Sequence, residues 1–284
     1  MQPTQPPIRT ATLSILAMIA FAANSVLCRV ALKETDIDAA SFTVIRLVSG
    51  AIVLAAICFF RDMQAKPTQF GDWPSAFSLF AYAAAFSFAY VSLPTGTGAL
   101  LLFGAVQLTM IAAGLLSGER LNVPQWTGLA IAISGLVLLL MPGIDSPPLL
   151  PAMLMVISGI AWGLYSLQAR GKGDPTKVTA GNFLRASIMG ITLVPFSLVL
   201  GIWDTNGIML AVISGGIASG LGYVLWYAVL KNLTTVSAAS IQLSVPVIAA
   251  LGGVIFLAEP LTMTLVMASL TILGGIALVI RHRA

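Results

Sequence analysis

The chain has 284 residues, of which 58% are apolar and only 8% are charged, and its mean hydropathy is +0.98. A soluble domain carries about 25% charged residues, because water must wet its surface. A chain this apolar cannot bury enough side chains in a water-soluble fold, so the composition indicates an integral membrane protein. The net charge of +4 comes from basic residues that stand singly, without the cluster that nucleic-acid binding requires.

Cysteine and histidine are too few for a disulfide framework or a metal centre. Cys28 and Cys58 both lie in apolar runs, where we expect them to pack, and the only histidine is His282. The sequence also contains no phosphate-binding glycine-rich loop and no set of a nucleophile, a histidine and an aspartate. We therefore expect neither an enzyme nor a bound cofactor.

Apolar runs of about 20 residues, the length that crosses the hydrocarbon core as a helix, follow one another along the chain. The first continues to about Leu32 without a cleavage pattern, which indicates a membrane helix rather than a signal peptide. We predict an all-α membrane protein of ten transmembrane helices. In chain order they are Ala11–Leu32, Ala39–Phe60, Trp73–Ser92, Thr95–Leu116, Pro124–Met141, Leu149–Ala169, Asn182–Trp203, Ile208–Leu230, Thr234–Leu257 and Leu261–Ile280.

The positions of the basic residues predict how these helices are oriented. With a cytoplasmic N-terminus, ten of the fourteen basic residues fall in cytoplasmic segments, which is the preferred arrangement. The ten are Arg9, Arg61, Lys66, Arg120, Arg170, Lys172, Lys177, Lys231, Arg281 and Arg283. We therefore expect a multi-pass protein of a bacterial-type inner membrane with both termini in the cytoplasm.

The two halves of the chain resemble each other at a nearly constant offset. The corresponding segments are Ile19–Phe21 and Ile160–Trp162, Arg29 and Arg170, Ser117–Leu121 and Leu257–Leu261, and Ser134–Leu138 and Gly274–Leu278. Because each half has five helices, an odd number, the second half enters the membrane from the opposite side. We expect two inverted repeats, residues 1–144 and 145–284, around a central cavity, an architecture that favours alternating access.

A further set of residues stands in an order and at spacings typical of one transporter family. The set consists of Arg46, Gly118-Glu119-Arg120 with Gln125 and Gly128, Ile160-Ala161-Trp162-Gly163, Pro246 and Glu259. In these residues, and over nearly its whole length, the chain resembles the EamA-like branch of the drug/metabolite transporter superfamily. One departure is Val106, where family members often carry proline. The resemblance implies a ten-helix fold with a central cavity and the export of amino acids or related metabolites.

Polar and aromatic side chains within the spans predict where a solute binds, because polar groups in a membrane must face protein or a wet cavity. We expect the cavity to be lined by Asn24, Ser25, Tyr82, Gln107, Trp162, Tyr165, Ser166, Tyr223, Trp226 and Gln242. The two glutamines could equally join helices by hydrogen bonds. Trp73 and Tyr90 lie near span ends, a placement typical of interfacial aromatic belts.

Arg46 lies inside the second span, where its cation could hold an anionic group of the substrate. A long side chain can instead snorkel to the membrane surface or pair with Asp36 or Asp38, and we favour this structural interpretation. No acidic residue lies in the middle of a span, since Glu119 and Glu259 stand at helix ends. This absence argues against proton-driven export of cations.

The sequence favours a secondary transporter that exports small metabolites, for which we expect neutral or aromatic amino acids. One alternative is a carrier of anionic metabolites, such as sugar or nucleotide phosphates, with Arg46 as the ligand. The other is a membrane scaffold without transport, against which the inverted repeat argues. The expected partners are the substrate and the lipid bilayer, without nucleic acid. We expect a functional monomer, because ten helices can enclose a cavity.

Overall fold

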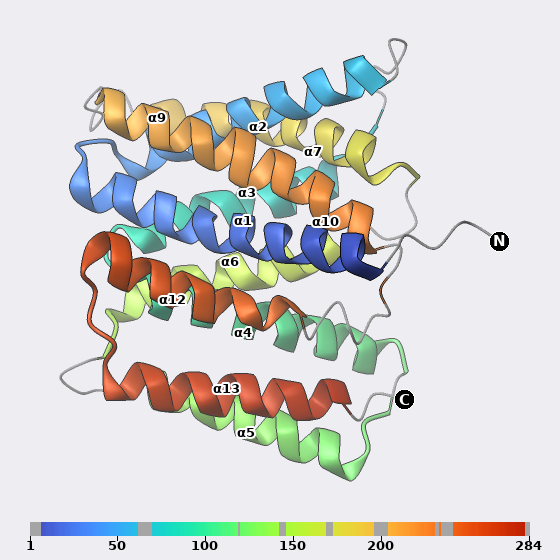
Figure 1. Ribbon diagram of the computed structural model, residues 1–284, viewed down its shortest axis with the longest axis vertical. Coiled ribbons are helices and arrows are strands. Elements are labelled where there is room, and N and C mark those ends of the chain that lie inside the picture. Colours follow the sequence, from blue (N-terminus) through green and yellow to red (C-terminus); the bar gives the residue numbers. More distant parts are fainter. Residues whose placement is uncertain are drawn as a thin grey trace.

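Every regular element of the computed structural model is helical within the residues that it describes, which are 7–61, 70–118, 120–141, 146–168, 173–195, 204–230, 233 and 241–281. The helices lie side by side along a common direction (Figure 1). Their bounds are α1 Pro7–Glu34, α2 Ala39–Arg61, α3 Trp73–Tyr90, α4 Thr95–Leu116, α5 Val123–Leu140, α6 Leu149–Gln168, α7 Pro175–Gly190, η2 Ile191–Leu193, α9 Thr205–Ile213, η3 Ser214–Leu221, α10 Gly222–Leu230, α12 Ser244–Leu257 and α13 Met263–Arg281.

Seven of the described helices are long and apolar enough to cross a membrane. One of them is the continuous helix α9–η3–α10, in which the η3 segment widens to π-helical turns. Outside these seven, α12 is apolar but has only 14 residues, and α7 has 16. The structure thus supports a multi-pass, all-helical membrane protein, while the expected ten spans are matched in part.

Successive helices alternate in direction along the chain (Figure 1). As a result, α1 begins and α13 ends at the same end of the bundle, and α1 and α6 run in opposite directions. Polar side chains that satisfy the first free N–H groups set several helix starts. The capping residues are Asp38 before α2, Asp72 before α3, Asn122 before α5, Asp174 before α7 and Asp204 before α9.

The contacts between helices place α1, α2, α3, α6 and the α9–η3–α10 helix around the centre of the molecule. α6 packs against α3 and α4, α2 against α7 and η3, and α1 against α10 and α12. α5 and α13 form a tight pair at one side of the bundle (Figure 1). A Cβ on Gly128 of α5 would lie 2.6 Å from the carbonyl oxygen of Gly275 of α13, so glycine permits this close approach.

The helix that contains the start of the predicted seventh span begins before Asn182. α7 begins at Pro175, directly after Asp174, whose carboxylate accepts from the N–H of Thr176 (2.9 Å). Asn182 lies inside the helix and is fully buried, with its Oδ1 accepting from the N–H of Asp72 (2.9 Å). Buried polar residues in the first turns of α7 therefore contact other parts of the protein, as the Oδ1 of Asn182 does, so they do not mark a boundary with water.

Candidate functional site

Aromatic rings gather around Trp162 of α6 at the centre of the molecule. Tyr223 of α10 is stacked on its indole, with ring centroids 5.1 Å apart and planes 22° apart. Tyr82 of α3 and Phe21 of α1 complete the cluster, with centroids 4.9 and 6.4 Å from that of Trp162. Rings from four helices thus form a wall on which an apolar or aromatic group of a solute can pack.

These rings line a small central cavity. It is lined by Phe21, Asn24, Ser25, Tyr82, Phe86, Leu102, Phe103, Trp162, Ala218, Ser219 and Tyr223. Its volume is about 20 Å³, which holds about one water molecule. This volume is too small for an amino-acid-sized solute, so the binding of such a solute requires the walls to separate.

A hydrogen-bond network crosses the polar side of this cavity. The Nδ2 of Asn24 donates to the Tyr82 hydroxyl (3.2 Å), and the Oγ of Ser214 donates to the Oδ1 of Asn24 (2.5 Å). Ser158 of α6 donates to the carbonyl oxygen of Tyr82 (3.0 Å). Helices α1, α3, α6 and η3 are joined by these bonds, which fix where the Tyr82 hydroxyl lies.

Arg46 of α2 lies directly behind this wall and is only 2% exposed. Its Nη2 donates to the Tyr82 hydroxyl (2.8 Å), and its Nε makes a long contact with the Oγ of Ser219 (3.4 Å). The guanidinium carbon also lies 5.1 Å from the ring centroid of Tyr82 and 4.9 Å from that of Phe86. Aromatic faces attract a cation, so the two rings partly replace the water that Arg46 loses on burial.

The structure shows neither of the two arrangements expected for Arg46, snorkelling or an ion pair with Asp36 or Asp38. The side chain does not snorkel, since it is buried, and no carboxylate of the described residues forms an ion pair with it. Asp38 instead caps its own helix, where its carboxylate accepts from the N–H groups of Ala40 and Ser41 (both 2.9 Å). Arg46 therefore remains a candidate ligand for an anion.

The close contact of α2 with η3 explains how Arg46 reaches this place. A Cβ on Gly215 would overlap the carbonyl oxygen of Arg46 and the Oγ of Ser49. Glycine at this position lets the two backbones touch, which brings Ser219, one turn further along η3, beside the guanidinium. Wide turns of this kind are frequent at functional sites, because they turn side chains away from a regular helical register.

Five of the ten residues predicted to line the cavity do so, namely Asn24, Ser25, Tyr82, Trp162 and Tyr223. The other five are Gln107, Tyr165, Ser166, Trp226 and Gln242, and none of them is part of the wall. Tyr165 and Trp226 are buried behind the wall. The ring centroid of Tyr165 lies 5.5 Å from that of Trp162, and the ring centroid of Trp226 lies 6.0 Å from that of Phe21.

The three remaining polar residues have other surroundings. Ser166 donates to the carbonyl oxygen of Trp162 in its own helix (2.8 Å). Gln107 is buried, and its Nε2 has no hydrogen-bond partner among the described residues. Gln242 is half-buried. The structure thus joins neither glutamine to the cavity.

The prediction missed several residues of the wall, chiefly Phe21, Leu102 and Phe103. The internal repeat contained a signal for Phe21, since this residue corresponds to Trp162 of the second half. Tyr90 was assigned to the interface, and this is wrong. It is fully buried, and its hydroxyl donates to the carbonyl oxygen of Thr95 (3.2 Å). Trp73 is 53% exposed, and its interfacial position stays a prediction.

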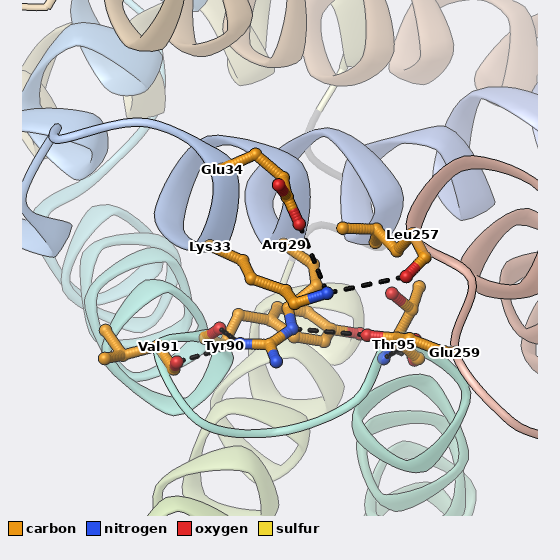
Figure 2. Close-up of polar contacts among 8 residues, drawn as sticks. All are labelled: Arg29, Lys33, Glu34, Tyr90, Val91, Thr95, Leu257 and Glu259. Atoms are coloured by element: carbon orange, nitrogen blue, oxygen red, sulfur yellow. Dashed lines mark hydrogen bonds and ion pairs between the residues drawn. The ribbon is translucent and has the colours of Figure 1, made fainter.

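A second polar cluster lies at the end of the bundle where α1 ends (Figure 2). The Nε of Arg29 and the Oε1 of Glu259 form an ion pair of 3.2 Å, with side chains 12% and 11% exposed. The Nη1 of Arg29 also donates to the carbonyl oxygens of Tyr90 (2.9 Å) and Val91 (2.8 Å), at the end of α3. A cation is favourable at this position, because the last carbonyl groups of a helix lack partners.

Glu259 joins a further helix to this cluster, which we call the end cluster (Arg29, Tyr90, Val91, Thr95 and Glu259). Its Oε2 accepts from the N–H of Thr95, the first residue of α4 (2.7 Å). The preceding residue, Pro94, provides no side-chain cap, so the carboxylate from the α12–α13 turn fulfils that role. The end cluster thus ties together α1, α3, α4 and the α12–α13 turn.

A hollow of about 270 Å³ adjoins the end cluster. Its walls come from the α3–α4 turn, the residues before α6 and the α12–α13 turn, and they include Thr97, Ser146, Pro148, Glu259 and Thr262. The hollow is much larger than the central cavity. Within the described part of the chain, no three His, Cys, Asp or Glu side chains are grouped as metal ligands, here or elsewhere.

The sequence is similar to several proteins, some of which bear transporter names. A protein of Pseudomonas aeruginosa named only as uncharacterized is 54% identical over 279 residues, which cover 98% of this chain and 96% of the relative. An uncharacterized transporter of Archaeoglobus fulgidus is 26% identical, with 77% and 81% covered. A probable terminal-alkyne amino-acid exporter of Streptantibioticus cattleyicolor is also 26% identical, with 92% and 90% covered.

The fold has a counterpart among solved structures. A crystal structure with 20% sequence identity superposes with a TM-score of 0.66 and covers 96% of this chain and 99% of its own. Residues 8–141 and again residues 149–281 match the EamA-like transporter family, which confirms the resemblance seen in the motifs. This is a family of membrane transporters rather than enzymes, of the drug/metabolite type. With both halves matched, the chain belongs to the EamA-like transporter family.

Proposed function

We propose that this transporter exports small metabolites, in the first place neutral or aromatic amino acids. The observation that carries the proposal is the central cavity, in which rings from four helices stand opposite amide and hydroxyl groups. Such a site suits a solute with an apolar body and a polar head. The amino-acid exporter among the distant relatives supports the same substrate class.

The proposed mechanism is alternating access between two inverted repeats of five helices, residues 1–144 and 145–284. Two features support it: α1 and α6 run in opposite directions, and each half matches the family separately. The excess of basic residues favours a cytoplasmic position for the end at which α1 begins. The protein would then lie in a bacterial-type inner membrane with both termini inside, and it needs no second copy to enclose the cavity.

The end cluster is the proposed outer gate. It lies at the end opposite to the start of α1, and one ion pair there holds together segments of both halves (Figure 2). Opening this end requires Arg29 and Glu259 to separate, after which the 270 Å³ hollow would connect the cavity with the outside. A nearly buried ion pair is suited to this role, because water can solvate both charges once they part.

Uptake into proteoliposomes tests the proposal. Purified protein is reconstituted and given a panel of labelled amino acids, with and without a pH gradient. We expect saturable uptake of neutral or aromatic amino acids, and a rise in KM for Trp162→Ala, which removes the ring at the centre of the cavity. Indifference to the gradient would indicate facilitated diffusion or exchange.

The two other functions predict different results. Movement of sugar or nucleotide phosphates, but of no amino acid, would identify a carrier of anionic metabolites. One observation supports that second candidate function, namely that Arg46 is buried without an acidic partner among the described residues. If neither the amino acids nor the sugar and nucleotide phosphates were transported or bound, a membrane scaffold would be indicated.

A further inference from the structure

The guanidinium of Arg46 has donors to spare. A guanidinium carries five N–H groups in a planar fork. Two hydrogen bonds are formed, both to neutral hydroxyl groups, and the longer of them is 3.4 Å. The Nη1 is buried and has no hydrogen-bond partner among the described residues. The cation is therefore surrounded by rings and hydroxyl groups, and no residue in the described part of the chain supplies it with an anion.

A buried cation of this kind is costly in a membrane protein. Two hydroxyl groups and two aromatic faces replace only part of the hydration that Arg46 loses. Charged groups at such depth usually face a substrate pathway or a partner of opposite charge. Since the described residues supply no such partner, an anion that enters with the substrate is the simplest one.

The residues around Arg46 place its unused N–H donors beside the cavity. Tyr82, Phe86 and Ser219 all contact the guanidinium, and all three line the cavity. The Tyr82 hydroxyl oxygen accepts from both Arg46 and Asn24, so its own proton is left to donate to a third group. A carboxylate that reaches this corner would meet the Tyr82 O–H first and the arginine fork behind it.

The charges near the cavity favour a carboxylate over an ammonium group or a doubly charged phosphate as the part of the substrate that is recognised. No acidic side chain is among the described residues that line the cavity, so the ammonium group of an amino acid finds no ion pair there. A doubly charged phosphate would need more donors and cations than one guanidinium provides. A carboxylate carries one charge and two oxygens, which match the arginine fork.

We propose that Arg46, together with the Tyr82 hydroxyl, binds the carboxylate of the substrate, and that the substrate's ammonium group contributes little to recognition. The substrates are then small carboxylic acids with an apolar or aromatic body, of which amino acids are one kind. This inference rests on the proposed transport function. Tyr82 must move as the cavity enlarges from about 20 Å³, which would expose the guanidinium to the ligand.

Two ligands that each lack one charged group of phenylalanine test the proposal. 3-Phenylpropionate retains the carboxylate, and 2-phenylethylamine retains the ammonium group. Both are used as competitors of labelled phenylalanine in proteoliposomes, and as additives in thermal unfolding of the purified protein. We expect phenylpropionate to compete, and phenylethylamine to compete about 10- to 100-fold more weakly, the factor for one hydrogen-bonded charge.

Arg46→Gln should abolish this preference, since it keeps the polarity of the side chain and removes its charge. Arg46→Lys should retain part of the preference, because a single ammonium replaces the fork. Arg61→Gln, at the exposed end of the same helix, is the matched control and should keep the preference. Trp162→Ala should weaken both competitors alike, since its ring contacts the apolar body.

The outcomes separate this inference from the transport function. If phenylalanine is transported but both competitors act equally, or if Arg46→Gln keeps the preference, the carboxylate site is refuted and transport stands. If no solute is transported but phenylpropionate raises the unfolding temperature only when Arg46 is present, the carboxylate site stands and the proposed function fails.

Discussion

Two arginines of similar burial have opposite surroundings in this protein. Arg29 is satisfied by a carboxylate and two carbonyl oxygens (Figure 2). Arg46 is even less exposed, but it contacts only hydroxyl groups and rings, and its Nη1 has no hydrogen-bond partner among the described residues. The first arrangement ties helices together, whereas the second leaves a charge available for a ligand.

Burial alone does not reveal what a charged residue does in a membrane protein. The presence of a counter-ion determines the effect of a mutation. Removing one member of a buried ion pair leaves the other charge uncompensated, whereas removing an unpaired charge leaves no uncompensated charge. The two arginines should therefore respond in different ways to the loss of charge.

Glu259→Gln should have the largest effect on stability. It leaves the Arg29 cation nearly buried without its counter-ion and weakens the bond to the N–H of Thr95. We expect a loss of about 3 kcal/mol, measured by thermal unfolding in detergent. Glu34→Gln is the control, because the exposed pair of Lys33 and Glu34 should contribute less than about 1 kcal/mol. Equal unfolding temperatures of the two variants would contradict a structural role of the end cluster.

The same variant should open the outer end of the cavity more often. Ser25→Cys places a thiol in the cavity wall, in a background where Cys28→Ala and Cys58→Ala remove the native thiols. We expect a membrane-impermeant thiol reagent, added from outside, to label it several times faster when Glu259→Gln is also present, because the loss of a bond made only in the closed state shifts the population. An unchanged labelling rate would mean that the end cluster is no gate.

Gly215→Ala tests the close contact that holds Arg46 in place. The added methyl group overlaps the carbonyl oxygen of Arg46, so α2 and η3 must move apart. We expect a loss of about 1–3 kcal/mol in stability and a weaker preference for carboxylate ligands. Gly274→Ala on α13 is the matched control, since a Cβ there would meet no atom within 4 Å, and helix propensity favours alanine. A Gly215→Ala protein as stable as Gly274→Ala would be incompatible with the described contact.

Helix positions could be predicted from the sequence wherever composition changes at a boundary. Thr95–Leu116 is predicted to the residue, because Pro94 interrupts the run before it and Ser117-Gly118 follows it. The start of α7 could not be predicted in this way. Asn182 is fully buried inside this helix and its Oδ1 accepts from the N–H of Asp72, and no local sequence pattern indicates that distant partner.

The residues of the cavity were harder to predict, because lipid and protein interior are both apolar, so periodicity does not tell which side of a helix faces inward. Gln107 and Gln242 looked equivalent to Asn24 in sequence, yet only Asn24 reaches the cavity. Arg46 was expected to snorkel or to pair with Asp36 or Asp38, because its partners in the structure, Tyr82 and Ser219, come from helices that are distant in the sequence. Glu119 and Arg170, which correspond to Glu259 and Arg29 in the repeat, lie outside the described residues.

Arg46→Gln should leave stability nearly unchanged, in contrast to Glu259→Gln. The glutamine amide can still donate to a hydroxyl oxygen, and the cost of burying an unpaired cation disappears. We expect a change of less than about 1 kcal/mol in thermal unfolding without ligand, in either direction. A large loss would show that Arg46 holds the helices together, and the contrast between the two arginines would then be invalid.

Asp204 is a carboxylate close to solvent, and its substitution should have the smallest effect on stability. It caps α9, with oxygens accepting from the N–H groups of Asn206 (3.2 Å) and Gly207 (3.3 Å). Partial desolvation opposes ionisation here, but these N–H groups outweigh it, and the pKa of Asp204 is lowered from its ordinary value. Because the folded pKa is the lower one, the stabilisation is complete above the ordinary pKa of aspartate and is lost as pH falls through the folded value.

Asp204→Ala should therefore unfold at a slightly lower temperature than the unmodified protein near neutral pH, and this difference should shrink as the pH falls into the acidic range. Asp204→Asn separates charge from capping, since an amide oxygen still accepts from the same N–H groups without titrating. It should lie between the other two proteins at neutral pH and coincide with the unmodified protein in acid. If the difference in unfolding temperature between Asp204→Ala and the unmodified protein persisted unchanged in acid, ionisation of Asp204 would not contribute to stability. The hydrogen bonds of the uncharged side chain alone would then account for the cap.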